Sequence, residues 1–370
     1  MSETTETTTE TIPEPPVVLP AGRVRFAQIA PDSYRHPLDQ QATAALRAVP
    51  GFELVAAKVS QYSIEKIIYH EMCASAVRVT PRQLPRIHAL LREACAILDL
   101  PEPSLFVSQT PIANAFAAGR DNPTMVLHTG LVELLSEDEL LAVIAHEMGH
   151  IHCGHTVYRL MAIILQLLAK LGDMHLGMAD VFSLPIRVAL MEWTRKAEFS
   201  ADRAAVLVTQ NPDTVFSALF KLTGGSPKIF EQMDRAEYLK QADDYDRPDW
   251  SRLDKFYKVM LETEKTHPIP VLRAREVLRW GATAEYKAIL AGEYVRRDAV
   301  GDRRRGPSQL SAKTLSGDNV VCPHCGEKTD AAFTFCTHCG REFAGMSDTP
   351  NTPESAAPSG TEATETAVDA

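Results

Sequence analysis

The chain has 370 residues, of which 45% are hydrophobic and 23% are charged, a composition typical of a soluble globular protein and not of a disordered chain. Most of the formal net charge of −10 lies at the two ends, because residues 1–20 carry four acidic residues, residues 347–370 carry five, and neither segment carries a basic one. The part between them is nearly neutral, so its charge gives no indication of nucleic-acid binding, and we expect none.

The composition divides the chain into five parts. Both ends are mixtures of Thr, Ser, Pro, Glu and Ala with almost nothing to bury, which predicts disordered acidic tails. A linker rich in turn formers and arginine separates a large domain from a small cysteine-containing unit, and we interpret its basic run as solvated in preference to a contact with an acidic partner or a membrane. The predicted parts are a tail at 1–22, a domain at 23–298, a linker at 299–319, the cysteine unit at 320–343 and a tail at 344–370.

The sequence predicts a cytoplasmic protein. Its N-terminal residues have neither the basic region nor the apolar run of a signal peptide, and the seven cysteines are too unevenly placed for a secreted disulfide framework. The most apolar stretch, Leu160–Ala169, is shorter than the roughly 18 residues that a membrane span needs. We favour a buried core helix there, and the alternative is a peripheral contact of residues 160–168 with a membrane surface or a partner.

Helical signals dominate the large domain, and a small sheet accompanies them. Thr80 and Pro81 predict the N-cap and first residue of an amphipathic helix whose apolar residues follow at steps of three and four. Three short segments, 104–108, 113–118 and 124–129, then predict a small meandering sheet. We therefore expect an α+β fold that is mainly helical.

The next predicted helix carries the chemistry. Ser136 and Glu139 form a capping-box pattern at its start, and His146-Glu147-Met148-Gly149-His150 follows within it. Because residues four apart lie on one face of a helix, both imidazoles can reach one metal ion. Glu147 is rotated by about 100° around the helix and can contact a water molecule bound to that ion.

A second segment supplies a candidate third ligand. Glu198 lies 48 residues after His150 and is flanked by small residues, as expected of a carboxylate on a closely packed helix. Asp202, one turn later, faces the same way and is predicted to accept a hydrogen bond from the outer nitrogen of a ligand imidazole.

Together these motifs resemble the gluzincin zinc metallopeptidases related to the HtpX heat-shock protease and the CAAX prenyl endopeptidase. The likeness extends to Asn114-Ala115-Phe116-Ala117, which is similar to the substrate-edge strand of that family, and to Thr266-His267-Pro268 with a following arginine. It spans about residues 35–280 and implies a zincin-like fold. Many relatives carry transmembrane helices between the second histidine and the third ligand, whereas here that interval contains several charged residues, so we expect a soluble member.

The resemblance implies a role for each matching residue. His146, His150 and Glu198 would bind a catalytic zinc, and Glu147 would be the general base that takes a proton from the zinc-bound water. His267 and Arg273 would stabilise the oxyanion or contact substrate, and for His267 the alternative is a surface histidine in a turn. The strand containing Asn114, Ala115 and Phe116 would pair with the substrate backbone, although Asn114 fits a turn-forming role equally well.

Other polar residues near the motif are interpreted as bystanders. Helix rotation turns His152 away from His150, and neither His152 nor His155 is expected to bind metal. Cys153 is expected to be a small buried residue and not a nucleophile.

The cysteine unit resembles a zinc ribbon. Cys322, Cys325, Cys336 and Cys339 form two CxxC pairs, and four thiolates in this spacing suit one structural zinc ion. Zinc ribbons bind nucleic acid or protein, and with few basic residues here we favour a protein partner.

These motifs predict a hydrolase, a zinc-dependent endopeptidase that cleaves polypeptides in protein quality control, with one catalytic and one structural zinc. The alternative is a latent or non-proteolytic zinc-binding chaperone or adaptor that acts through the ribbon.

Overall fold

The computed structural model describes residues 17, 19–49, 52, 64–120, 122–162, 179–246 and 267–299, together with the backbone of 319–321 and 328–330. Of residues 64 and 179–188 it describes only the backbone. The chain divides into two compact units, Met1–Lys313 and Thr314–Ala370. The predicted tails and the linker fall mostly outside the described residues.

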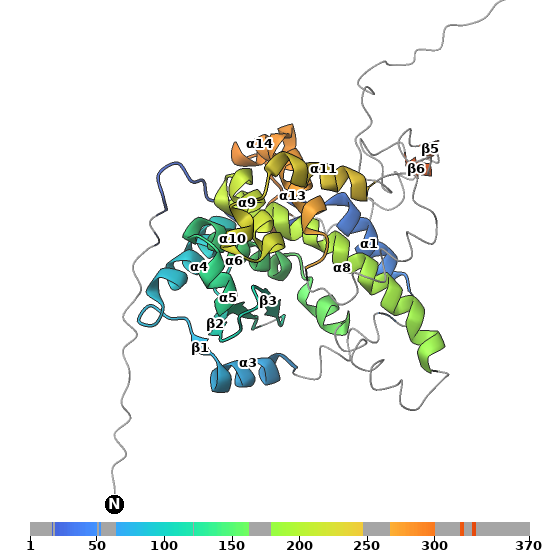
Figure 1. The fold of residues 1–370 in the computed structure, drawn as a ribbon. Helices are drawn as coiled ribbons and strands as arrows, with labels where there is room; N and C mark the ends of the chain where they lie inside the picture. The colour runs from blue at the N-terminus through green and yellow to red at the C-terminus, as the bar shows by residue number, and fades with distance from the viewer. Residues whose placement is uncertain are drawn as a thin grey trace, which may run out of the picture. The chain divides into compact units, whose positions relative to one another are not determined.

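The first unit is mainly helical (Figure 1). Its helices are the 3-10 helix η1 (Pro31–Ser33) and the α-helices α1 (Pro37–Arg47), α3 (Ile64–Ser75), α4 (Pro85–Leu98), α5 (Thr129–Leu134), α6 (Glu137–His152), α8 (Ala179–Thr209), α9 (Pro212–Gly224), α10 (Pro227–Phe230), α11 (Arg235–Tyr245), α13 (Pro270–Ala282) and α14 (Ala284–Leu290). A further helix begins at residue 156. The mainly helical α+β prediction is therefore confirmed.

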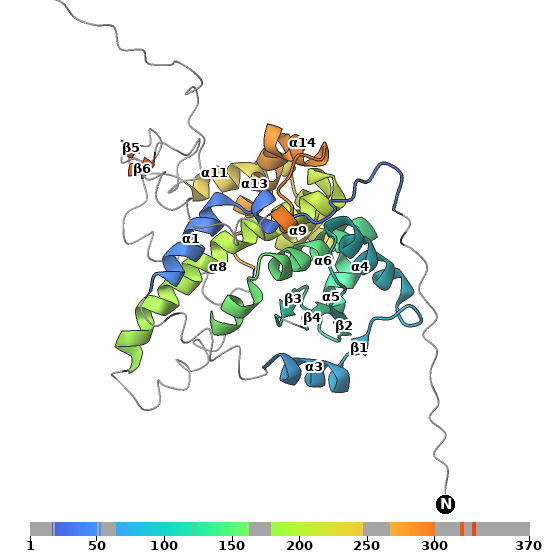
Figure 2. The same ribbon diagram turned by 180° about the vertical axis from the view of Figure 1, so that it is seen from behind.

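A four-stranded mixed sheet accompanies these helices. Its strands are β1 (Val77–Arg78), β2 (Ser104–Ser108), β3 (Ala115–Ala118) and β4 (Thr124–His128), arranged in the order β1-β2-β4-β3. Strand β2 runs parallel to β4, with Phe106 opposite Val126, whereas β1 and β3 pair antiparallel with their neighbours. The sheet lies between α3 on one side and α5 and α6 on the other (Figures 1 and 2).

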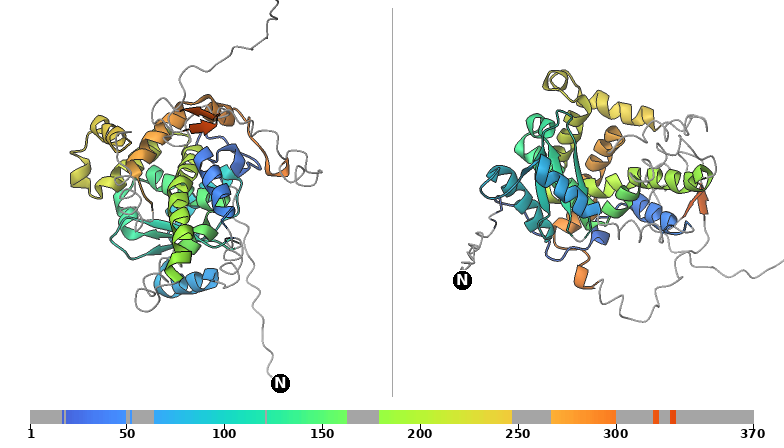
Figure 3. Two further views of the ribbon diagram at one scale, coloured as in Figure 1. Left: turned by 90° about the vertical axis from the view of Figure 1, so that its right-hand side faces the viewer. Right: turned by 90° about the horizontal axis from the view of Figure 1, so that it is seen from below.

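The helix α6 lies at the centre of the unit. It packs against α4, α8, α9 and strand β3, and its residues Leu141, Ile144, Ala145 and Met148 are fully buried. The long helix α8 crosses it, and α1 lies along α8, as Figure 3 also shows. Burial on these sides leaves the polar residues of α6 described below with little exposure to bulk solvent.

Two sequence predictions about these elements are wrong. The helix expected from Thr80 begins at Pro85, because Thr80 and Gln83 close a tight turn with backbone hydrogen bonds of 2.8 and 3.1 Å, and Pro85 takes the first helical position instead. The sheet is not a meander, because β3 lies at the edge and the chain returns to place β4 between β2 and β3. The three predicted strands are present, with β3 and β4 shorter than expected.

Among the residues that the structure describes, no helix is both long enough and apolar enough to cross a membrane. Of the apolar stretch 160–168, only residues 160–162 are described.

In the second unit, β5 (Asn319–Val321) and β6 (Lys328–Asp330) form an antiparallel pair. The four cysteines of the predicted ribbon, Cys322, Cys325, Cys336 and Cys339, lie outside the described residues.

Candidate metal centre

The start of α6 is fixed by a capping box. The Ser136 hydroxyl accepts a hydrogen bond from the backbone N–H of Glu139, and the Glu139 carboxylate accepts one from the backbone N–H of Ser136 at 2.8 Å. The same carboxylate accepts hydrogen bonds from Ser217 at 2.7 Å and from Lys221 at 2.8 Å on α9. The predicted cap is thus confirmed, and it also attaches α6 to α9, which sets the position of the residues later in the helix.

Gly149 allows α8 to approach α6 closely. A Cβ atom at this position would lie 2.7 Å from the Cβ of Ala204 and 2.9 Å from the Cα of Ala201, both on α8. Carbon atoms in contact are normally about 3.5–4.0 Å apart, so only glycine fits here without moving the helix. This close crossing brings Glu198 of α8 to the histidines of α6.

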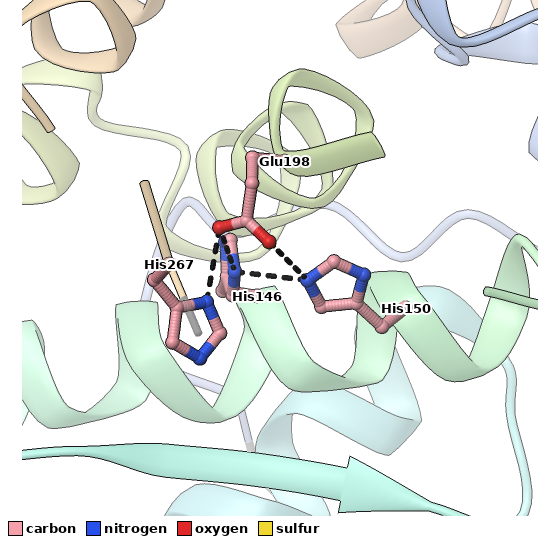
Figure 4. Close-up of side chains that lie close together, drawn as sticks. All are labelled: His146, His150, Glu198 and His267. Carbon is pink, nitrogen blue, oxygen red and sulfur yellow. Dashed lines mark hydrogen bonds and ion pairs between the residues drawn. The ribbon is translucent and has the colours of Figure 1, made fainter. Parts of the chain in front are cut away.

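Four side chains converge where the two helices cross (Figure 4). His146, His150 and Glu198 are 6%, 0% and 0% exposed, and the Nε2 atoms of the two histidines are 3.2 Å apart. One carboxylate oxygen of Glu198 lies 3.5 Å from His146 Nε2, and the other lies 3.3 Å from His150 Nε2. His267 joins this group, and one ligand atom from each of the four residues lies within 4.8 Å of the others.

These distances fit a zinc ion. Four ligands at about 2.0–2.1 Å in a tetrahedron around zinc are about 3.3–3.4 Å apart, which is close to the three separations among His146, His150 and Glu198. Two imidazoles and one carboxylate are also a common donor set for catalytic zinc. The residues present therefore fit a zinc site.

Glu147 lies next to this group and is fully buried. Neither of its carboxylate oxygens accepts a hydrogen bond from any described residue, although Arg159 lies 3.5 Å from one and His267 lies 3.4 Å from the other. A buried carboxylate without a hydrogen bond is costly, and such groups are found at sites of chemistry.

Asp202 and Arg273 support one side of the site. Asp202 lies 2.9 Å from the outer nitrogen of His146, as the sequence predicts. Arg273 donates two hydrogen bonds of 2.7 Å to Asp202 and lies 2.9 Å from Glu198. Its guanidinium is 4% exposed and faces these carboxylates, so the structure shows it positioning Asp202 and Glu198, and the predicted contact with substrate stays a prediction.

The charges of this arrangement shift two pKa values in opposite directions. Burial alone would lower the pKa of His146, but hydrogen bonds with Asp202 and Glu198 raise it to about 9. Burial would raise the pKa of Glu198, but His267 and Arg273 hold it well below its usual range. In the absence of metal, His146 is therefore cationic at neutral pH and Glu198 is ionised.

Of the other predicted residues, His267, Asn114 and Ala115 lie at the rim of the site, whereas Phe116 does not line it. His267 has a side chain 18% exposed, and it lies 2.9 Å from Glu198 through Nδ1 and 2.9 Å from the backbone oxygen of Ala115 through Nε2, so it is not a surface residue. Asn114 and Ala115 line a cavity at the site. Phe116 is half-buried, and its ring contacts His128 edge-on.

That cavity has a volume of about 410 Å³ and is apolar over most of its wall. His146, Glu147, Asp202, His267 and Arg273 form part of its wall, and it extends past β3 to α9. Its apolar lining comes from Ile112, Ala113, Ala115, Leu131, Ala142, Val143, Ala205, Val215, Ala218, Leu219, Leu222 and Pro270.

Sequence reasoning missed three residues of the site. Arg159 faces Glu147, and His155 and Asp39 continue from the outer nitrogen of His150, with His155 lying 3.0 Å from both His150 and Asp39. Nothing in the sequence pattern connects Asp39 to a motif more than 100 residues away. Gly149 did carry a signal, since an isolated glycine within an apolar helix often marks a close approach.

Comparison with known proteins agrees with this geometry. Residues 81–281 match Peptidase family M48, and residues 318–344 match a domain of unknown function (DUF7577). The chain is 39% identical over 267 residues to "Plastoglobule-localized metallopeptidase 48, chloroplastic" of Arabidopsis thaliana, covering 72% of this chain and 77% of that protein. It is 28% identical to "Protease HtpX homolog" of Moorella thermoacetica, covering 51% of this chain and 71% of that one, and 32% identical to "Protease HtpX homolog 2" of Methanosarcina mazei, covering 41% and 59%. The predicted HtpX-type resemblance is thereby confirmed, and the chain is a metallopeptidase that belongs to Peptidase family M48.

Proposed function

We propose that the protein is a zinc-dependent endopeptidase in which His146, His150 and Glu198 hold the metal. Peptidases of family M48 use zinc, and the observation that carries the proposal is the buried triangle of donor atoms, 3.2–3.5 Å on each side, with Glu147 beside it. When bound, zinc polarises a carbonyl group and lowers the pKa of a water molecule from about 16 towards 7.

The residues around the metal then divide the proton transfers between them. Glu147 accepts the proton of the attacking water and delivers it to the nitrogen of the leaving amine, and its burial favours this role because it makes a retained charge expensive. His267, 3.4 Å from Glu147, donates a hydrogen bond to the oxyanion that forms on the scissile carbonyl. Asp202 and Arg273 keep His146 and Glu198 in place.

Strand β3 and the adjacent cavity support a polypeptide substrate. Among the described strands, β3 is an edge strand next to the site, so its backbone groups can pair with an extended peptide without reading its sequence. The cavity supplies selectivity, since it is large enough for an aromatic or branched side chain and its wall is apolar from β3 to α9. We propose that it takes a large apolar side chain of a residue next to the scissile bond.

Substitution of the proposed general base tests the reaction. Glu147→Gln should reduce cleavage of an unfolded protein such as casein by about 10²–10⁴-fold while the protein retains its zinc. Glu133→Gln on α5, where the side chain is exposed, is the matched control and should cleave normally. Equal activity of Glu147→Gln and wild type would refute the mechanism.

Substitution in the cavity tests the proposed selectivity. Ala218→Leu on α9 narrows the cavity, so cleavage of a peptide library should shift from Phe and Leu towards smaller residues at one position beside the cleaved bond. Ala236→Leu on the exposed side of α11 should leave the preference unchanged. An unchanged preference in Ala218→Leu would mean that the cavity does not hold the substrate.

The latent alternative rests on His267. Its Nδ1 atom is 2.9 Å from Glu198, and its Nε2 atom is bound to Ala115 on the edge that a substrate would use. If His267 occupies the fourth metal position and blocks this edge, His267→Ala should raise the rate of cleavage. If His267 stabilises the oxyanion, as we propose, the same substitution should lower it.

The cysteine unit completes the proposal. We propose that Cys322, Cys325, Cys336 and Cys339 hold a second, structural zinc and that the ribbon recruits a protein partner or substrate, consistent with cytoplasmic quality control of unfolded polypeptides. Metal analysis should give two zinc ions per chain, and replacing the four cysteines with serine should leave one. A single zinc in the unaltered chain would refute the second site.

A further inference from the structure

We infer that Asp39, acting through His155, fixes the tautomer of His150 that can bind the metal. The inference rests on the proposed metal site and assigns a positioning role to two residues outside the HExxH and ExxxD motifs. Asp39 also lies outside residues 81–281, the part of the chain that matches the peptidase family.

The three side chains form an unbroken buried chain of polar contacts. The Nδ1 atom of His150 is 3.0 Å from Nδ1 of His155, and Nε2 of His155 is 3.0 Å from Oδ2 of Asp39. The exposed fractions of Asp39, His155 and His150 are 0%, 1% and 0%. At 3.0 Å both contacts are direct, so each proton in the chain is assigned by its protein neighbours.

The end of the chain at Asp39 is fixed as an acceptor. Its carboxylate accepts hydrogen bonds from Ser200 at 2.7 Å and from Thr43 at 3.1 Å, and the guanidinium of Arg35 lies 3.2 Å away. An ionised carboxylate can only accept, so the Nε2 atom facing it must carry a proton.

The remaining protons follow in order. A neutral His155 with its proton on Nε2 has a lone pair on Nδ1, and this lone pair must accept a hydrogen bond from Nδ1–H of His150. A neutral His150 with its proton on Nδ1 has its lone pair on Nε2, the atom that faces Glu198 and His146. The carboxylate of Asp39 therefore determines, through two imidazole rings, that Nε2 of His150 carries the lone pair that can bind the metal.

Packing holds the intermediate ring in the required orientation. The indole of Trp193 meets the His155 ring edge-on at 5.3 Å, and its Nε1–H donates to Thr43 at 2.8 Å, the residue that also donates to Asp39. Because Asp39 and Thr43 lie on α1, and α1 packs along α8, helix α1 contributes to the metal site through His155.

The two metal-binding histidines are therefore supported differently. His146 donates its outer N–H directly to Asp202, whereas His150 reaches its carboxylate only through His155. Outer partners of this kind typically change metal affinity by about 10–100-fold when they are removed.

Zinc affinity measured by competition with a chelator tests the relay without any need for cleavage. His155→Phe keeps the ring shape and removes both nitrogens, so the affinity of the catalytic site should fall by about 10–100-fold. His152→Phe is the matched control, because His152 contacts Tyr34 and not the site, and its affinity should stay within about twofold of wild type. Folded His155→Phe with wild-type affinity would overturn the inference. If His155→Phe loses affinity but the wild-type protein cleaves no peptide, the inference stands and only the proposed function is refuted.

A second measurement reads the tautomers in the unaltered, zinc-loaded protein. Histidine-selective ¹⁵N NMR should show His155 protonated on Nε2 and His150 protonated on Nδ1. Protonation of His155 on Nδ1 would contradict the relay, whatever the variants do.

Two substitutions of Asp39 test whether its role is to accept the hydrogen bond from His155. Asp39→Asn should keep its amide oxygen towards His155, since Arg35 and Ser200 on that side donate, and should retain the His155 tautomer and most of the zinc affinity. Asp39→Ala removes the acceptor and should lose both. Equal zinc affinity of a folded Asp39→Ala and wild type would overturn the inference.

Discussion

The substitution Gly149→Ala should separate zinc binding from folding. The added Cβ would lie 2.7 Å from Cβ of Ala204 and 2.9 Å from Cα of Ala201, and since carbon atoms in contact are about 3.5–4.0 Å apart, α8 must move by about 1 Å. Metal–ligand distances tolerate only about 0.2 Å, so Glu198 would no longer reach an ion held by His146 and His150.

The effect on stability should be small by comparison. Overpacking costs about 1–3 kcal/mol, and alanine recovers about 1 kcal/mol of helix propensity over glycine, so the free energy of unfolding should fall by about 0–2 kcal/mol. Zinc affinity should fall about tenfold or more. The two quantities are measured by urea denaturation of the metal-free protein and by chelator competition.

Gly224→Ala on α9 is the matched control. Its Cβ would meet the sulfur of Met233 at 2.7 Å, and this flexible side chain can move aside without shifting a helix. Its zinc affinity should equal that of the wild type. A folded Gly149→Ala with unchanged zinc affinity would show that the close crossing of α6 and α8 does not position Glu198.

Three further predictions follow from the buried charges. Arg273→Met leaves the carboxylates of Asp202 and Glu198 without their cation and should cost about 3–5 kcal/mol in urea unfolding, and a loss below about 1 kcal/mol would contradict this. Burial would raise the pKa of Asp39, but His155 and Arg35 lower it to about 2. The ionised form of Asp39 should therefore stabilise the metal-free protein by about 2 kcal/mol above pH 4. This contribution should vanish as pH falls through 2. Unfolding of wild type and Asp39→Asn between pH 5 and 2 measures it, and parallel curves would refute it. Because the pKa of His146 is about 9 without metal, zinc binding at pH 7 should release about one proton, which calorimetry in buffers of different ionisation enthalpy detects; zero release would be inconsistent with the site.

The sequence predicts those parts of the site whose geometry is set within one helix. The spacing of His146 and His150, and that of Glu198 and Asp202, follows from 3.6 residues per turn, and the structure places each pair on one face as expected. The cap at Ser136 is equally local. Such features need no knowledge of the rest of the fold.

Features that depend on contacts between distant segments could not be predicted in this way. The parallel pairing of β2 with β4 depends on how the chain between them returns, and the hydrogen bond that His155 donates to Asp39 spans 116 residues. Thr80 matches an N-cap pattern, but the helix begins at Pro85 because Thr80 and Gln83 close a turn before it. Local patterns set candidates, and tertiary contacts choose among them.

Charge balance explains why this buried site suits a reaction that develops negative charge. Without metal, the carboxylates of Glu147, Glu198 and Asp202 face the cations of Arg159, Arg273 and protonated His146, so the group is close to neutral. A bound zinc ion would add two positive charges, and the loss of one proton from His146 would then leave an excess of about one positive charge in a region of low dielectric constant. When Glu147 accepts the proton of the attacking water, the net charge of the group does not change, but one negative charge moves from Glu147 to the oxyanion, closer to the excess positive charge. The supporting residues that keep the imidazoles neutral and the carboxylates ionised therefore favour the transition state over the bound substrate.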